Sequence, residues 1–226
     1  MSNVTVKGKS LYHVERRLGG TARYTTYLAR HDDRPESDLI LKIAKGVESN
    51  GALDREAYFL TELRDHALAL EAEYARINPG SVLNYQLGFP HLVETFLAES
   101  QGNRRVLILA FDAVDVVGDF VSLAMIRERE RMRVDPKTSA WMMGKTLKIL
   151  AFAHMQGISV GSITGDDILV DRSHHLVSLF DWSEAMRHPG KIPPAIARKE
   201  IVSAAREVIL VLGGDPDSGT IPFDKQ

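Results

Sequence analysis

The 226-residue chain is 44% hydrophobic and 26% charged, an ordinary globular composition, and is long enough for one large domain or two small lobes. Its formal net charge of -2 gives no electrostatic reason to bind nucleic acid or an anionic membrane. The absence of cysteine excludes disulfides, thiolate nucleophiles and cysteine-based zinc sites. We expect a cytoplasmic protein, because no apolar run approaches the roughly 18 residues of a membrane span and the N-terminal segment is polar.

The first half of the chain predicts a β-rich lobe that carries one helix. Apolar residues spaced by three and four over residues 51–70 predict an amphipathic helix. A turn is expected over residues 31–37, and breakers fill residues 78–90. Alternating or β-branched stretches predict strands over 11–18, 25–30, 38–45, 91–99 and 104–111. The expected buried stripe of the helix is Leu53, Ala57, Leu60, Leu63, Ala67 and Leu70.

The second half predicts a mainly helical lobe. A short hairpin is expected between residues 167–171 and 176–182. The final predicted helix is apolar nearly all round, so we expect it to be the buried central helix of its lobe. The predicted helices cover 120–133, 139–157 and 197–214.

Three charged residues lie on these elements or directly after them. Lys42 closes the strand pattern "LILK", and Glu56 lies on the helix that follows it. Asp181 follows the second strand of the short hairpin, in "LVSLFDWSEA". Taken singly, each is more often a solvated surface charge or a turn residue. Their order along the chain is what gives them significance.

This order of elements and residues resembles the protein kinase-like superfamily over about residues 11–213, and in particular a compact pseudokinase with a degenerate catalytic loop. The resemblance implies an α+β, two-lobed protein kinase-like fold. Its small β-rich N-lobe with one helix would cover residues 1–112, and a shortened, mainly helical C-lobe would cover residues 113–226. In that family a strand lysine contacts nucleotide phosphates, a helix glutamate holds the lysine, and an aspartate binds metal. Lys42, Glu56 and Asp181 stand at these positions.

The stretch "GISVGSITGDDILVD" (157–171) fits the framework of the family's catalytic loop but departs from its chemistry. Ser162 occupies the position of the catalytic aspartate, so the resemblance provides no catalytic residue. Val160 replaces a histidine, and Asp167 replaces the metal-binding asparagine. Asp167 and Asp181 would offer two oxygen ligands to Mg²⁺ or Mn²⁺. Asp166 and Asp167 fit a solvated turn pair equally well.

The glycine-rich loop of the family is also altered. Gly19 is kept, whereas Thr21 and Tyr24 replace the second and third glycines. Glycines matter there because backbone N–H groups must approach the phosphates closely. We expect Tyr24 to crowd the phosphates or to hold the loop open. The residues implied to bind nucleotide are Gly19, Lys42, Glu56, Asp167 and Asp181.

The sequence thus predicts a kinase-like protein that has lost efficient phosphotransfer and acts as a binding or regulatory module. An unidentified protein partner is expected, together with weak binding of ATP and Mg²⁺ or Mn²⁺. The alternative is an active, atypical ATP-dependent kinase, acting on proteins or small molecules, in which Asp167 or Asp181 replaces the lost base. In both cases Lys42 and Glu56 should lie within salt-bridge reach, with Asp181 pointing into the same cleft.

Overall fold

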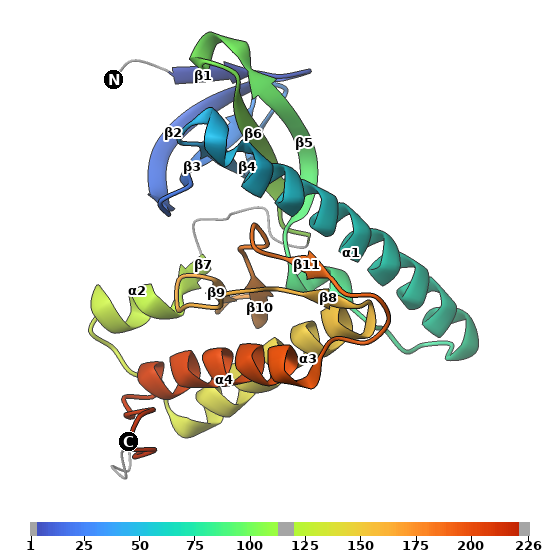
Figure 1. The fold of residues 1–226 in the computed structure, drawn as a ribbon, viewed down its shortest axis with the longest axis vertical. Coiled ribbons are helices and arrows are strands. Elements are labelled where there is room, and N and C mark those ends of the chain that lie inside the picture. Colours follow the sequence, from blue (N-terminus) through green and yellow to red (C-terminus); the bar gives the residue numbers. More distant parts are fainter. Residues whose placement is uncertain (1–3, 113–119, 222–226) are drawn as a thin grey trace.

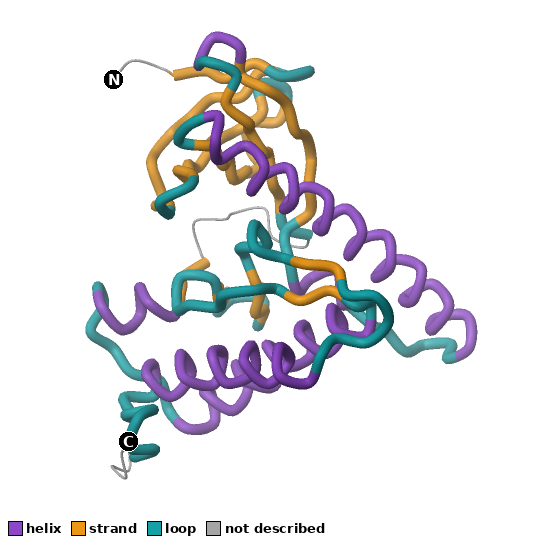
Figure 2. Tube along the Cα trace, viewed as in Figure 1, coloured by secondary structure: helices purple, strands orange, loops and turns teal. Residues whose placement is uncertain are grey.

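The computed structural model describes residues 4–112 and 120–221, which form an upper and a lower lobe (Figure 1). Strands gather in the upper N-lobe, and helices dominate the lower C-lobe (Figure 2). One long helix, α1 (Asn50–Ile77), runs obliquely from the sheet past the C-lobe. The predicted lobe boundary after Asp112 adjoins residues 113–119, which lie outside the described residues.

Within residues 4–112, six strands form one antiparallel sheet in the order β1-β2-β3-β4-β6-β5. These strands are β1 (Val4–Lys7), β2 (Leu11–Gly20), β3 (Tyr24–His31), β4 (Arg34–Ala44), β5 (His91–Ala98) and β6 (Arg104–Ala110). Short 3₁₀ turns are η1 (Val47–Ser49), η2 (Tyr85–Gly88) and η3 (Glu99–Gln101). The sheet carries apolar side chains on both faces. One face joins the main core with α1, and the other buries a smaller cluster that includes Tyr12, Leu41 and Ile108.

Within residues 120–221, three helices pack around two small sheets. The helices are α2 (Leu123–Glu128), α3 (Pro136–Met155) and α4 (Pro194–Val211). The strands are β7 (Phe120–Ser122), β8 (Ile158–Ser159), β9 (Ile168–Asp171), β10 (Leu176–Leu179) and β11 (Met186–Arg187). They pair in the orders β10-β9-β7 and β11-β8. The predicted hairpin is therefore present as β9 and β10.

The two lobes share one hydrophobic core. Leu53 and Leu60 of α1 are fully buried in the same cluster as Phe152 of α3 and Trp182. Phe89, just after η2, lies between the last two, with ring centroids 6.1 Å from Phe152 and 6.0 Å from Trp182. This aromatic contact joins the connection after α1 to α3 and to the segment after β10.

The helix over residues 51–70 is confirmed, although α1 continues seven residues further, to Ile77. The first five residues of the expected stripe are buried, and Leu70 is half-buried. After Ala67 no residue of α1 is buried, because the stripe stops while strong helix formers continue in "EAEYARI". The end of α1 therefore extends beyond the core (Figure 1).

Several predicted boundaries are wrong. Strand β4 begins at Arg34, so the turn expected over residues 31–37 shrinks to two residues. The helix expected to begin at Phe120 begins at Leu123, because residues 120–122 pair with β9 as strand β7. β1 was not predicted, since its four residues are too few to show a period.

Helix α4 is not buried on all sides. Its buried residues are Glu200, Ala204, Val208 and Val211, which form one face toward α2 and α3. Ile201, at the edge of this face, is 39% exposed, and Val202, opposite it, is 49% exposed. The expectation of a central, enclosed helix is therefore corrected to a helix with one covered face. In the part of the chain that the structure describes, no helix is long and apolar enough to cross a membrane.

Glu200 attaches α4 to the loop between β8 and β9. Its side chain is 1% exposed, and Oε1 accepts a hydrogen bond from the Gly161 backbone N–H at 2.8 Å. Its Oε2 lies 2.6 Å from Nε2 of His154. His154 is thus largely enclosed and holds a polar partner.

We expect Glu200→Ala to lower the free energy of unfolding by about 2 to 4 kcal/mol, because it leaves a buried N–H and the His154 ring without their acceptor. Urea denaturation measures this directly. Glu200→Gln, which keeps an acceptor oxygen, is the matched control and should lose less. A loss for the alanine variant within about 0.5 kcal/mol, as at ordinary surface positions, would contradict this role.

Candidate functional site

A buried ion cluster lies between the lobes. Nζ of Lys42, on β4, is 2.6 Å from Oε1 of Glu56, on α1, and 3.6 Å from Oδ1 of Asp181, which follows β10. The side chains of Lys42 and Glu56 are 0% exposed, and that of Asp181 is 13% exposed. The structure thus brings the three sequence-predicted charges together in the expected geometry.

Regular spacing brings the cluster together. Glu56 lies on the buried stripe of α1, three residues after Leu53 and four before Leu60, so it faces the sheet. Lys42 pairs with Thr26 on one side and Leu107 on the other, at the centre of the sheet. Burial raises the pKa of Glu56, and the ammonium of Lys42 opposes that effect.

Two aromatic rings enclose the lysine. Nζ of Lys42 lies 4.5 Å from the ring centroid of Tyr24 and 4.0 Å from that of Phe180. Tyr24 is only 3% exposed and lies beside Asp181. Burial and the carboxylates of Asp181 and Glu56 raise the pKa of the Tyr24 hydroxyl, so it stays protonated. In this conformation Tyr24 covers the lysine that the kinase resemblance assigns to phosphate.

Asp181 remains a carboxylate despite its surroundings. Burial alone would raise its pKa, but the ammonium of Lys42, the Ser183 N–H and the Tyr24 hydroxyl together lower it below the usual value. The Ser183 N–H donates to Oδ1 at 3.0 Å. A ligand that binds Asp181 would therefore compete with Lys42, Ser183 and Tyr24 for its carboxylate.

The catalytic-loop segment keeps its shape without a base. Val160 is buried, and Gly161 has a φ of 103°, a conformation that favours glycine. A Cβ on Gly161 would lie 2.7 Å from Cβ of Glu184, so the loop also packs closely there. Ser162 is exposed in the cleft, and its backbone N–H donates to Oε2 of Glu184 at 3.2 Å. Serine at this position offers no carboxylate.

Asp167 and Asp166 separate into different environments. Asp167 is half-buried, and its Oδ2 accepts hydrogen bonds from the backbone N–H and hydroxyl of Thr164 at 2.8 and 2.7 Å. Burial, and to a lesser extent Asp181, raise the pKa of Asp167 to about 6. Asp166 is exposed and lies 3.3 Å from the hydroxyl of Ser122. Only Asp166 therefore resembles a solvated turn residue.

The turn between β2 and β3 is attached to the opposite lobe. Nη2 of Arg23 lies 2.8 Å from Oε1 of Glu184 and 3.2 Å from the hydroxyl of Ser183. Gly20 has a φ of 148°, and a Cβ there would lie 2.4 Å from the carbonyl oxygen of Tyr24. Gly19, in contrast, has open space around its Cα. Of the predicted cofactor residues, Gly19 thus lies at the cleft but apart from the ion cluster.

Sequence reasoning missed Arg23 and Glu184. They are 161 positions apart, and neither belongs to a local pattern that distinguishes it from a surface charge. Their side chains are 37% and 41% exposed, so the pair contributes little to stability by itself. Its significance is positional, because it spans the mouth of the cleft.

These elements enclose a cleft of about 680 Å³, a volume typical of small-ligand sites. From the N-lobe it is lined by Arg16, Arg17, Leu18, Gly19, Gly20, Thr21, Arg23, Tyr24, Thr26 and Ile40. From the C-lobe it is lined by Phe120, Val121, Ser122, Met125, Arg129, Ser162, Thr164, Asp166, Asp167, Leu169, Phe180, Asp181 and Glu184.

Asp167 and Asp181 fit the protein's share of a divalent-cation site. Mg²⁺ beside phosphates usually takes one or two carboxylates and completes its shell with phosphate oxygens and water. The repulsion that helps to raise the pKa of Asp167 is the kind of interaction that a cation relieves. No group of three or more histidine, aspartate or glutamate side chains able to hold a metal occurs within residues 4–112 and 120–221. A cation here would therefore need ligand oxygens as well.

Comparisons with known proteins identify the fold. No protein-family model matches the sequence, and no curated protein matches it. The chain is similar to the solved BubR1 kinase domain, with 13% identity and a TM-score of 0.63, over 91% of this chain and 64% of that chain. The Mycobacterium tuberculosis PknI kinase domain shows 17% identity and a TM-score of 0.58, over 98% of this chain and 82% of that one.

A third similar structure is the CAK complex from Chaetomium thermophilum bound to ATP-gamma-S, with 18% identity and a TM-score of 0.61, over 88% of this chain and 62% of that one. The chain therefore has a two-lobed protein kinase-like fold, as the sequence predicted. It spans about 64% of the length of the BubR1 chain that it matches. Identities this low define the fold and not the activity.

The raised pKa of Asp167 predicts a pH-dependent loss of stability. The folded state holds the Asp167 proton more tightly than the unfolded state, so the stabilisation present below pH about 4 is lost as pH rises through about 6. We expect Asp167→Asn to raise the free energy of unfolding on the order of 1 to 3 kcal/mol near pH 8 and little near pH 4. Asparagine keeps an acceptor oxygen for Thr164.

Denaturant unfolding with a chelator present, repeated across that pH range, measures the difference. Asp166→Asn, at the exposed neighbour, is the matched control and should change stability by no more than about 0.5 kcal/mol at either pH. A destabilised Asp167→Asn variant near pH 8 would show that the charge is compensated in the folded protein.

Proposed function

We propose that this kinase-like protein is a pseudokinase, a binding or regulatory module that has lost efficient phosphotransfer and retains weak nucleotide and metal binding. The observation that carries the proposal is the enclosure of Lys42, which Tyr24 and Phe180 cover while Glu56 and Asp181 occupy its charge. A phosphate can reach Lys42 only if Tyr24 gives up its contact with Asp181 and the ammonium.

The missing base supports the same conclusion. A positioned general base contributes typically 10²-fold to 10⁴-fold, or about 3 to 5 kcal/mol of barrier, and Ser162 cannot supply it. Phosphoryl transfer depends mainly on positioning and electrostatics, so this loss alone does not abolish it. Together with the covered lysine, however, it removes both the proton acceptor and the phosphate contact.

Weak nucleotide binding is supported by what remains. Asp167 and Asp181 would hold Mg²⁺ or Mn²⁺, which would neutralise the charge of ATP phosphates near the two carboxylates. The cleft has room for a nucleotide, and one structure with a similar fold carries an ATP analogue. The affinity should be low, because displacing Tyr24 costs its cation–π contact with Lys42 and exposes a buried ring.

The second candidate function is an active, atypical kinase acting on a protein or small molecule. Asp167 and Asp181 are poor replacements for the base, since Thr164 occupies the first and Lys42 with Tyr24 the second. Glu184 is better placed, because its carboxylate accepts a hydrogen bond from the Ser162 N–H at the position of the missing side chain. This contact is the observation that favours the second candidate.

An unidentified protein partner and a cytoplasmic location also belong to the proposal. The exposed end of α1 and its following loop carry Leu68, Ile77 and Val82, with exposures of 42%, 60% and 84%, which suits a protein-binding surface. The lack of cysteine suits a reducing compartment.

We expect the purified protein, with Mg-ATP and a generic acceptor, to show phosphotransfer and ATP hydrolysis at background. Ser162→Asp should recover little, because Tyr24 still covers Lys42. A radiolabel transfer assay measures both variants. Robust turnover that is abolished by Lys42→Ala and by Glu184→Gln would instead establish the active kinase.

We expect Tyr24→Ser to raise the affinity for Mg-ATP about tenfold, because the cover over Lys42 no longer has to be displaced. Tyr24→Phe should give a smaller gain, since it removes only the hydroxyl contact with Asp181. At 100 times the dissociation constant, ligand should stabilise the protein by about 2.7 kcal/mol, which thermal unfolding detects.

This stabilisation should require a divalent cation and should shrink in Asp181→Ala. Tyr27→Ser, at a position three residues along β3 and so on the opposite face of the sheet, is the matched control and should leave the affinity unchanged. Equal affinities for wild type and Tyr24→Ser would show that Tyr24 does not limit access.

A further inference from the structure

A small cavity of about 30 Å³ lies between η2, α3 and β10, and it shares no described lining residue with the cleft between the lobes. Two of its lining residues are Lys145 and Lys148 of α3, and none of the described ones is acidic. The pocket packs closely, because a Cβ on Gly88 would lie 2.6 Å from Cγ1 of Ile149. The other lining residues are Asn84, Tyr85, Leu87, Leu176 and Val177.

Lys148 is held at this cavity by two neighbours. Its Nζ donates a hydrogen bond to Oδ1 of Asn84 at 2.8 Å and lies 4.8 Å from the ring centroid of Tyr85. That ring is itself fixed, because it stacks on Phe152 with the ring centroids 4.7 Å apart. Asn84 uses one of the donors of the ammonium, so the remaining donors are available to a ligand.

Lys145 and Lys148 repel each other across this site. They are three residues apart on α3 and therefore lie on the same side of the helix. Burial lowers the pKa of Lys148, and the ammonium of Lys145 lowers it further. Glu71 opposes this effect more weakly, and its Oε1 accepts a hydrogen bond from the Gln86 N–H at 3.0 Å. Within residues 4–112 and 120–221, no carboxylate lies within ion-pair distance of either lysine.

The size of the cavity limits the group that it can hold. A single water needs at least about 10 to 15 Å³ of such volume, so the 30 Å³ here has room for one or two oxygen-sized atoms. A carboxylate brings two oxygens, whereas a phosphate group presents three. One carboxylate beside the two ammonium groups therefore suits both the charge and the volume.

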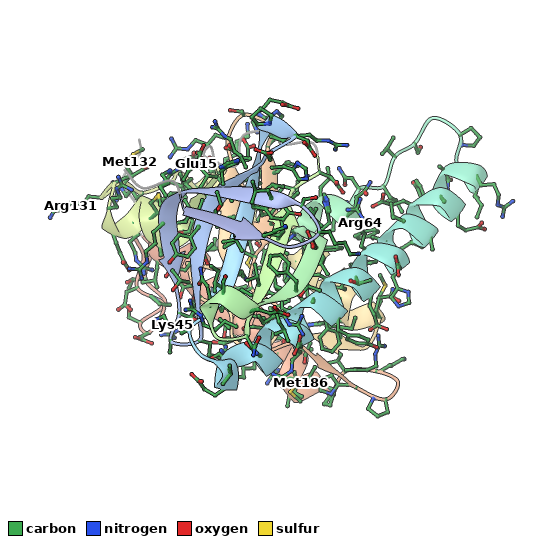
Figure 3. The ribbon with its side chains drawn as sticks, turned by 90° about the horizontal axis from the view of Figure 1, so that it is seen from above. Glu15, Lys45, Arg64, Arg131, Met132 and Met186 are labelled. Carbon is green, nitrogen blue, oxygen red and sulfur yellow. The ribbon has the colours of Figure 1, made fainter. Side chains whose placement is uncertain are left out.

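An exposed apolar side chain adjoins the cavity. Val82 is 84% exposed and lies two residues before Asn84 in the chain, so their Cα atoms are within about 7 Å of each other. Val82 belongs to the loop after α1. Seen from above, the last turns of α1 and this loop project from the body of the molecule, beyond Arg64 (Figure 3). A single extended segment of a partner can therefore contact Val82 and reach the cavity.

We propose that the cavity between η2, α3 and β10 binds a glutamate or aspartate side chain of an acidic protein segment, with its carboxylate on Lys145 and Lys148. Neighbouring apolar side chains of the same segment cover Val82. This inference deepens the proposed function and rests on its protein partner, whose chemistry it specifies. It does not depend on a nucleotide in the cleft.

Fluorescence anisotropy of the full chain with a labelled peptide of alternating glutamate and leucine residues tests the proposal. We expect saturable binding that weakens as salt is added. Lys145→Gln and Lys148→Gln should each raise the dissociation constant about tenfold, because each removes a charged donor. Lys137→Gln, at an exposed lysine of α3 outside the cavity, is the matched control and should bind like wild type. Thermal unfolding verifies that every variant is folded.

A second measurement follows Lys148 itself. NMR titration of its Cε resonance should show that the peptide raises the pKa of Lys148, because a bound carboxylate favours the charged ammonium. Lys145→Gln should raise the same pKa without peptide, since it removes the repulsion. An unchanged pKa in both experiments would show that the two ammonium groups do not share a site.

Four results of the peptide titration would overturn the proposal. They are no binding, an equal loss in the Lys137 variant, equal binding of a peptide with glutamine in place of glutamate, and tighter binding of a peptide with phosphoserine there. Failure of the proposed function is distinguishable, because phosphotransfer by the wild type would refute the pseudokinase assignment and leave this site standing. Tyr24→Ser, in the cleft, should leave peptide binding unchanged.

Discussion

The burial of one lysine ammonium between the lobes constrains most of what surrounds it. An isolated charge removed from water is costly, so Lys42 needs its two carboxylates and its two aromatic neighbours in place at once. Those partners come from α1, from the segment after β10 and from β3. A shift of any one of these elements leaves a buried charge uncompensated. The cluster therefore fixes the sheet, helix α1 and the segment after β10 relative to each other.

A second, more exposed contact acts on the same elements from the other side. Arg23, next to Tyr24, reaches across the mouth to Glu184, which also contacts the backbone of Ser162. The adjacent residues Arg23 and Tyr24 thus both contact the opposite side of the cleft, Arg23 through Glu184 and Tyr24 beside Lys42 and Asp181. The relative position of the two lobes thus depends on side-chain contacts across the cleft.

The ion cluster could be predicted from sequence because each member has a local signal. Lys42 ends a strand-like run, Glu56 falls on a helical stripe, and Asp181 follows a hairpin strand. The Arg23–Glu184 contact has no such signal, since it depends on how two distant turns meet. The same limit explains the β7 error, because three residues carry no period and only pairing with β9 makes them a strand. Burial of α4 was overestimated because composition cannot show which face a neighbour covers.

Helix α1 extends well beyond the hydrophobic core. At 1.5 Å per residue its 28 residues span about 42 Å, yet its last buried residue is Ala67. Glu56 lies near the anchored end, and the free end lies about 30 Å away at Ile77. The carboxylate that pairs with Lys42 and the exposed end of α1 thus belong to one continuous helix, half of it packed in the core and half in solvent.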